Sequence, residues 1–241
     1  MNSPRAITTR PRAISGFTLL ELLVVVGLVA VLSATAFLGL AGGGREAAMR
    51  SSQALLANLI VAARTKAMTT GCKSRLLVNV DVAAPDRYLR LVVLQVGRQA
   101  GASPANWDTF QQVNLPAGVF AIPASLAGLV SAPTEWKRSS DASADLVSDL
   151  FTAQQVSVSL EGDAATGLWT GVAFTPFGTL AALAGGPPPK GSLVLAPGRR
   201  RAPENASAGD PPIELELPAA VRGILLSAYG VPTLLRDRNA F

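Results

Sequence analysis

The sequence predicts an α+β protein in which a long N-terminal helix packs on a globular head of antiparallel β-strands. Three features carry this prediction: an apolar run at residues 17–41, a helical stripe at 45–70, and period-two alternation in several later segments. The 241 residues include one cysteine and no histidine. An intrachain disulfide, histidine-dependent catalysis and a histidine metal site are therefore excluded.

The apolar run has the length of a membrane-crossing helix. Its 25 residues contain one charged side chain, Glu21. A helix of this size reaches about 37 Å, and the hydrocarbon core of a bilayer is about 30 Å thick. The residues before it carry Arg5, Arg10 and Arg12 and no acid. Because basic flanks stay in the cytoplasm, the sequence predicts a single-pass helix with the C-terminal head across the membrane.

Three other interpretations of this run remain open. It could be a plain signal anchor, a secretory signal cleaved after Ala36 in the small-x-small pattern at 34–36, or a buried helix of a soluble core. None of them accounts for Glu21, because a carboxylate in lipid is unfavourable unless it has a partner.

The stretch "GFTLLELLVVVGLVAVL" at 16–32 resembles the N-terminus of type IV prepilins and pseudopilins. The resemblance implies that residues 1–16 are a leader, that a prepilin peptidase cuts between Gly16 and Phe17, and that Phe17 is then N-methylated. It also implies that 17–41 anchors the chain in the inner membrane and later forms the filament core. There Glu21 would pair with the N-terminal amine of a neighbouring subunit.

Cleavage at this position would change the charge of the chain. The full sequence has 21 basic and 16 acidic side chains, a balance of +5. Loss of the leader removes three arginines and no acid, which leaves 18 basic and 16 acidic side chains and a balance of +2. The basic character is therefore weak evidence for nucleic-acid binding.

A second helical pattern follows the apolar run. Three glycines at 42–44 weaken a helix by about 1 kcal/mol each relative to alanine, so we expect a flexible joint there. An amphipathic continuation is predicted over 42–71, with Gly71 as its stop. Its stripe is expected to pack on a sheet and consists of Ala48, Ser52, Leu55, Leu56, Leu59, Ala63 and Ala67.

The remaining residues, 72–241, are predicted to form the β-rich head. Exposed loops are expected at 184–190 and 197–212, which are rich in Gly and Pro, and 131–150 is polar with no clear period. Alternation of apolar and polar residues marks half-buried strands. The predicted strands lie at 76–82, 88–96, 108–114, 156–161, 168–175, 191–196, 213–217, 221–227 and 231–235.

Two stretches of the head, 55–80 and 169–180, are similar to minor pseudopilins of the GspH/FimT group. The first runs from a helix through Ala63-Arg64 into a strand. The second, "WTGVAFTPFGTL", contains a Phe-x-Pro-x-Gly pattern, which we interpret as a buried strand end and a tight turn and not as a ligand site. The body is longer than this group implies, and insertions at 97–150 and 197–212 would account for the difference.

The resemblances together imply a minor subunit of a type II secretion pseudopilus or a type IV pilus. Such a protein acts by assembly with other pilins and is neither an enzyme nor dependent on a cofactor. Two alternatives stay open. One is a DNA-binding minor pilin, with Arg236 and Arg238 as candidate contacts, although the group's Arg after glycine is absent at Val231. The other is a plain membrane-anchored binding module.

Other chemistry finds little support in the sequence. A phosphate-binding Gly-x-x-x-x-Gly-Lys-Ser/Thr loop is absent, which excludes the motor ATPase of such systems. Asp141, Asp145 and Asp149 recur at four-residue spacing, but a solvated polar loop explains them better than a metal site. We expect no metal ligands in the chain.

Overall fold

The structure is a computed structural model that describes residues 19–98, 106–151, 155–160, 166–183, 185–202, 210–216 and 218–241, without the side chains of 31–43. It divides into two compact units, Met1–Gly43 and Gly44–Phe241. Each unit is described by itself. The expected cleavage site at Gly16 and Phe17 lies outside the described residues.

One helix, α1 (Leu19–Thr70), contributes to both units. It ends where Gly71 adopts a φ of +65°, a left-handed conformation that glycine accepts without steric strain. Within the described residues, no helix is both long enough and apolar enough to cross a membrane.

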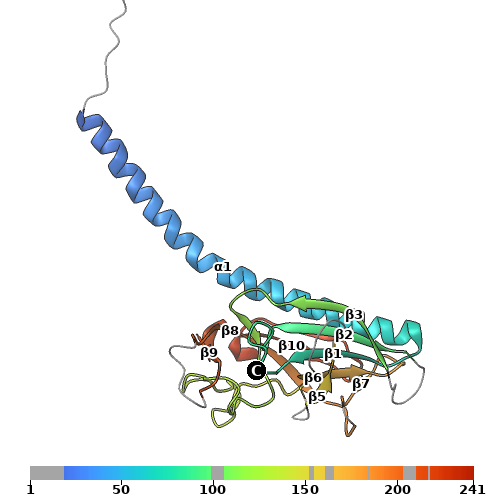
Figure 1. The fold of residues 1–241 in the computed structure, drawn as a ribbon. Helices are drawn as coiled ribbons and strands as arrows, with labels where there is room; N and C mark the ends of the chain where they lie inside the picture. Colours follow the sequence, from blue (N-terminus) through green and yellow to red (C-terminus); the bar gives the residue numbers. More distant parts are fainter. Residues whose placement is uncertain are drawn as a thin grey trace, which may run out of the picture. The chain divides into compact units, whose positions relative to one another are not determined.

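The head, Gly44–Phe241, contains two sheets (Figure 1). The first has the strand order β3-β2-β1-β6-β5, with β7 paired to β6. Its strands are β1 (Ser74–Asn79), β2 (Leu91–Gly97), β3 (Trp107–Asn114), β5 (Val156–Val158), β6 (Gly167–Phe174) and β7 (Leu180–Ala181).

The second sheet has the order β11-β10-β8-β4, with β9 paired to β8. Its strands are β4 (Val119–Ala121), β8 (Gly191–Arg200), β9 (Ile213–Leu215), β10 (Arg222–Leu226) and β11 (Pro232–Leu235). Two short 3₁₀ helices, η2 (Pro218–Ala220) and η3 (Arg238–Ala240), flank β10 and β11. The described strands of both sheets pair antiparallel, which confirms the α+β class.

The head half of α1 supplies one wall of the main core. Leu56, Ile60, Ala63 and Ala67 are fully buried at helical spacing. They share a hydrophobic cluster with inward-facing residues of β1, β2 and β6 from the first sheet and of β4, β8 and β10 from the second. The amphipathic stripe therefore packs on both sheets.

The buried residue Leu89 is hydrogen-bonded to both sheets. Its N–H donates to the carbonyl oxygen of Asn79 at the end of β1 (2.8 Å), and its carbonyl accepts from the N–H of Ala121 in β4 (2.9 Å). Leu89 adopts a φ of +54°, which is unusual for a residue with a branched side chain. The packing around its buried side chain maintains that conformation.

The irregular segment 131–150 is also anchored. Trp136 is 1% exposed, and its Nε1 donates to the carbonyl oxygen of Leu146 at 2.8 Å. Leu146 and Leu150 are fully buried. Residues 146, 148 and 150 are buried alternately, but the middle one is Ser148, so the sequence shows no apolar alternation that would have placed this segment.

The observed extent of β8 corrects the predicted start of one loop. It continues through Pro197 to Arg200, so the loop expected at 197–212 begins later than the sequence predicted. Residues 203–209 lie outside the described residues. The sequence analysis also missed the short strands β4 and β7.

Candidate functional site

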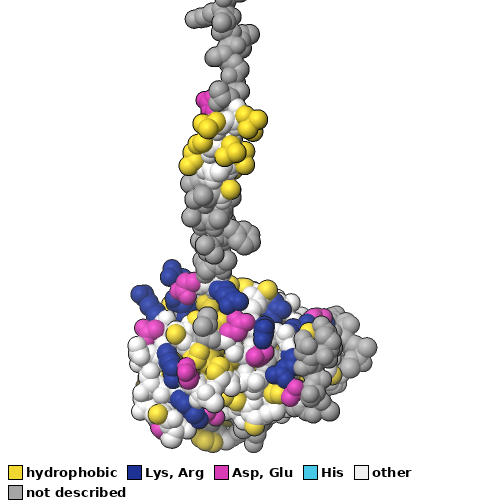
Figure 2. All heavy atoms as spheres, turned by 90° about the vertical axis from the view of Figure 1, so that its left-hand side faces the viewer, with side chains coloured by type: hydrophobic (Ala, Val, Ile, Leu, Met, Phe, Trp, Pro, Cys, Tyr) yellow, Lys and Arg dark blue, Asp and Glu magenta, His cyan; other side chains and the backbone are white. Residues whose placement is uncertain are grey.

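The described start of α1 combines an apolar surface with one carboxylate. Glu21 lies in the first turn of the helix. Leucine and valine side chains between 19 and 29 are 50–82% exposed. They occur at consecutive positions, so they surround the helix instead of forming one stripe. Figure 2 shows this dense apolar surface on the visible side of the first unit.

Such a helix requires an apolar environment, because water would solvate these side chains poorly. A carboxylate inside that environment requires a cation or hydrogen-bond donors close by. The chemistry of this segment is therefore that of a helix that inserts into lipid or among other apolar helices.

A comparison with family models relates this segment to a known motif. Residues 11–37 carry the prokaryotic N-terminal methylation motif. The motif covers the expected cleavage position between Gly16 and Phe17, and it includes Glu21. The match supports a type IV prepilin-like protein that prepilin peptidase processes and that assembles with other pilins.

The methylation motif is limited to the N-terminal part of the chain. No curated protein and no solved structure matches the sequence. The expected similarity of the head to the GspH/FimT group therefore stays a prediction, and the head is interpreted from its own geometry.

Directly after the glycines, the head half of α1 is fastened to the second sheet. Glu46 accepts a hydrogen bond from Arg50 at 3.0 Å and forms an ion pair with Arg222 of β10. Arg45 pairs with Glu216 at 2.8 Å. The pairs with Arg222 and Glu216 fix residues 45–46 of the helix against β10 and the segment that precedes it.

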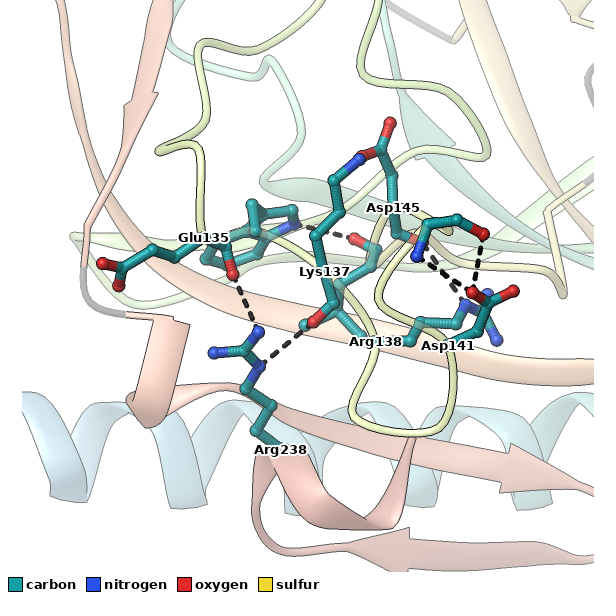
Figure 3. Close-up of polar contacts among 9 residues, drawn as sticks. Glu135, Lys137, Arg138, Asp141, Asp145 and Arg238 are labelled. Carbon is teal, nitrogen blue, oxygen red and sulfur yellow. Dashed lines mark hydrogen bonds and ion pairs between the residues drawn. The ribbon is translucent and has the colours of Figure 1, made fainter.

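The two candidate nucleic-acid contacts differ in their surroundings. Arg238 donates from Nε to the carbonyl oxygen of Lys137 (3.0 Å) and from Nη2 to that of Glu135 (2.8 Å), as Figure 3 shows. These bonds tie η3 to the segment 131–150. Arg236 is exposed. The role of the two arginines with DNA stays a prediction.

The arginines at 199–201 are each paired with an acid. Arg199 contacts Glu214 (3.0 Å), Arg200 contacts Asp86 (2.5 Å) and Arg201 contacts Asp210 (2.5 Å). On the face of the head visible in Figure 2, basic and acidic side chains are intermixed. A DNA-binding surface would instead present unpaired cations along a stripe.

Three aspartates of the 131–150 segment are held by contacts within that segment. Asp145 pairs with Lys137 (2.6 Å), Asp149 pairs with Arg138 (2.5 Å), and Asp141 accepts from the hydroxyl of Ser143 (2.6 Å; Figure 3). They line a cavity of about 580 Å³ together with residues 124–127. In the described part of the chain, no group of three potential ligands is placed to hold a metal ion.

The sequence analysis missed the exposed aromatic side chains of two turns. It interpreted the stretch from Phe174 to Gly178 as a buried strand end and a tight turn, without assigning an exposed role to Phe177. The structure places Phe174 at 0% exposure and Phe177 at 86%. Tyr229, in a turn between β10 and β11, is 70% exposed. An aromatic residue inside a Pro-Phe-Gly turn was the available signal, because turn tips face solvent.

Proposed function

We propose that this protein is a minor pilin-like subunit of a type II secretion pseudopilus or a type IV pilus. One observation carries the proposal: the methylation motif at 11–37 includes the start of α1, where the exposed apolar residues between 19 and 29 are interrupted by a single carboxylate. The proposed precursor is cut after Gly16, methylated at Phe17 and held in the inner membrane by the helix. The head then lies in the periplasm until assembly.

The proposed role of Glu21 follows from electrostatics. Cleavage creates a new amine at Phe17, and the motif places Glu21 four residues further along the chain. In the low dielectric of packed apolar helices, an unpaired carboxylate is strongly unfavourable. Pairing Glu21 with the Phe17 amine of a neighbour would stabilise its charge only in the correct register. The pair would therefore select the position at which a subunit enters the filament.

The head is proposed to act by contact and not by catalysis. The ion pairs of Glu46 and Arg45 hold it on the helix that follows the glycines. Residues 42–44 would let the apolar helix and the head change orientation between membrane and filament, because glycine weakens helical structure there.

The N-terminal sequence and intact mass of the protein, purified from its native membrane, test this function. We expect a chain that begins at N-methylated Phe17. A start at Met1 or Asn2 would make the protein a plain signal anchor, and a start at Phe37 would make it a secreted protein. Either result would contradict the filament proposal.

A second experiment tests the carboxylate. Glu21→Gln is expected to leave cleavage and methylation intact and to reduce recovery of the protein in sheared filaments by at least about tenfold, which corresponds to about 1.4 kcal/mol. Glu21→Asp is the matched variant, since it keeps the charge on a shorter side chain. Unchanged recovery of Glu21→Gln would exclude the proposed pairing.

A further inference from the structure

Three elements of the head meet at a group of exposed apolar side chains. Met68, near the C-terminal end of α1, is 41% exposed. Phe177 lies in the turn between β6 and β7, and Tyr229 and Val231 lie at the turn between β10 and β11. Val231 is 49% exposed. These four residues are called the turn surface below.

Hydrogen bonds within each turn hold it in one conformation. In the first turn, the Gly178 N–H donates to the Thr175 carbonyl (2.9 Å), and the hydroxyls of Thr175 and Thr179 are 2.7 Å apart. In the second, the Gly230 N–H donates to the Ser227 carbonyl (2.8 Å). Gly178 and Gly230 have φ values of +75° and +70°, which other residues adopt with strain.

The two turns and the helix are in direct contact. The Leu180 N–H donates to the Ala228 carbonyl at 3.2 Å, which joins the turns. A Cβ atom added at Gly230 would lie 3.1 Å from the carbonyl oxygen of Gly178. A Cβ atom added at Gly178 would lie 2.7 Å from the sulfur of Met68. The turn surface is therefore one continuous and preorganised feature.

Its aromatic side chains contribute little to the folded core. Phe177 is 86% exposed, so folding leaves most of its apolar area in water. Rigid exposed aromatic residues are typical of the centres of protein interfaces, where they lose little conformational entropy on binding. The turn surface has the properties of a docking site.

The charge beside this surface indicates what docks there. Arg64 donates from Nε to the Gly178 carbonyl at 3.2 Å, which places its guanidinium at the first turn. Among the described residues, the structure assigns no carboxylate partner to Arg64. An occupant that desolvates this guanidinium would need to supply an acceptor, and a carboxylate is the strongest.

We propose that the turn surface binds a neighbouring filament subunit through an apolar patch that bears a carboxylate for Arg64. This inference rests on the proposed function, because it takes the partner from the filament. Arg64 lies 20 residues along α1 from Gly44, where the head begins, a distance of about 30 Å in a helix. The site therefore lies within the head, and an apolar surface that carries a carboxylate is one that another subunit can supply.

Photocrosslinking of the full-length protein in its native membranes tests the proposal. The photoreactive residue benzoylphenylalanine replaces Phe177 in one variant and Phe110 in the control. Phe110 is a 52% exposed aromatic residue of β3, and its ring is covered by Lys66 at 4.0 Å. We expect an adduct with another subunit that carries the methylation motif, in a yield about tenfold above the control.

Two further measurements complete the test. They are the sequence of the crosslinked peptide and the dependence of the crosslinking yield on the charge at residue 64. The crosslinked peptide is expected to be apolar and to contain Asp or Glu. Arg64→Glu is expected to lower the yield about tenfold, and Arg64→Lys to keep it within about twofold. Tyr229→Ala lowers the yield without disturbing the Arg64 contact, which guards against misfolding of the Arg64 variants.

Several outcomes overturn the proposal. They are an adduct with lipid, no adduct above the Phe110 control, a peptide without an acid, or a yield that does not respond to Arg64→Glu and Tyr229→Ala. If methylated Phe17 is found and the protein enters filaments in these cases, the proposed function stands and the docking site alone fails. If methylation and filament entry are themselves absent, the proposed function and the inference fail together.

Discussion

The side-chain amide of Gln53 donates a hydrogen bond of 2.6 Å to the backbone carbonyl oxygen of Gly223. The same nitrogen donates to the carbonyl of Leu235 at 2.8 Å. Gln53 lies on α1 and is 3% exposed, whereas its acceptors lie on the neighbouring strands β10 and β11. One polar side chain inside an apolar interface thus fixes the helix to a pair of strands about 170 residues away in the sequence.

Replacement of Gln53 by leucine is expected to lower the free energy of unfolding by about 2–4 kcal/mol, because the carbonyl groups of Gly223 and Leu235 lose this donor. Urea unfolding of the full-length protein in detergent measures this change. Gln111→Leu is the control, since Gln111 is exposed on β3 and its replacement should change stability by less than about 0.5 kcal/mol. Equal effects of the two changes would show that the Gln53 amide contributes nothing specific.

Acidification should weaken the contact between helix and sheet at Glu46. Burial alone raises the pKa of this carboxyl, but hydrogen bonds from Arg222 and Arg50 outweigh it, so the pKa lies below the ordinary value of 4.5. A carboxyl whose pKa is lowered by folding stabilises the protein above its unfolded pKa, and this stabilisation disappears as pH falls through the folded pKa.

The melting temperatures of the native protein and of Glu46→Gln, measured from about pH 7 to about pH 3, test this linkage. We expect the native protein to melt higher at neutral pH and the difference to shrink below pH 4.5, where Glu46 loses its charge. Arg50→Gln, which removes one of the two donors, should give a smaller difference. A gap that stays constant over the whole pH range would mean that the ionised Glu46 is not the source of the stabilisation.

The sequence predicted the elements that repeat with a clear period. The stripe through Leu56, Leu59 and Ala63 indicated the packed face of α1, because the contacts of a helix recur every three or four residues. The strands were found because their apolar residues recur at every second position. The extension of β8 was missed because Pro197 and Gly198 are typical of loops. Pro197 is tolerated there because β10 pairs with β8 only as far as Leu195, so no strand on that side requires its missing N–H.

The candidate sites divide into those that a local motif predicts and those that depend on contacts between distant parts of the chain. Gly16, Phe17 and Glu21 are predicted from a local motif within residues 11–37, and their roles stay predictions. The contacts of Arg238 could not be predicted, because its acceptors lie about 100 residues earlier in the chain. The exposure of Phe177 likewise depends on how its turn meets the helix and the second sheet, which no local pattern encodes.

Two glycines with different surroundings should respond in opposite directions to alanine. A Cβ atom at Gly171 in β6 would lie 2.0 Å from the carbonyl oxygen of Leu76 in β1, so the central strands of the first sheet would have to separate. Gly171→Ala is expected to lower the free energy of unfolding by about 3 kcal/mol or more. Gly44→Ala meets no atom within 4 Å and should raise it by about 1 kcal/mol, because alanine favours the helix.

Thermal unfolding of both variants, monitored by circular dichroism, measures the two changes in stability. A destabilising Gly44→Ala would indicate that the chain requires glycine at this position, as a bend in α1 would demand. A neutral Gly171→Ala would mean that β1 and β6 can separate freely, contrary to the register that joins Leu77 with Gly171.

Arg236 and Arg238 should differ in their effect on stability. Arg238→Ala removes donors from the carbonyls of Lys137 and Glu135, and we expect a loss of about 1–3 kcal/mol in the free energy of unfolding. Arg236→Ala changes an exposed side chain and should stay within about 0.5 kcal/mol. Urea unfolding compares them, and binding of duplex DNA at two salt concentrations gives an independent readout. If Arg238→Ala weakened DNA binding and left stability unchanged, its guanidinium would be a phosphate contact and not the structural donor that holds η3 on the 131–150 segment.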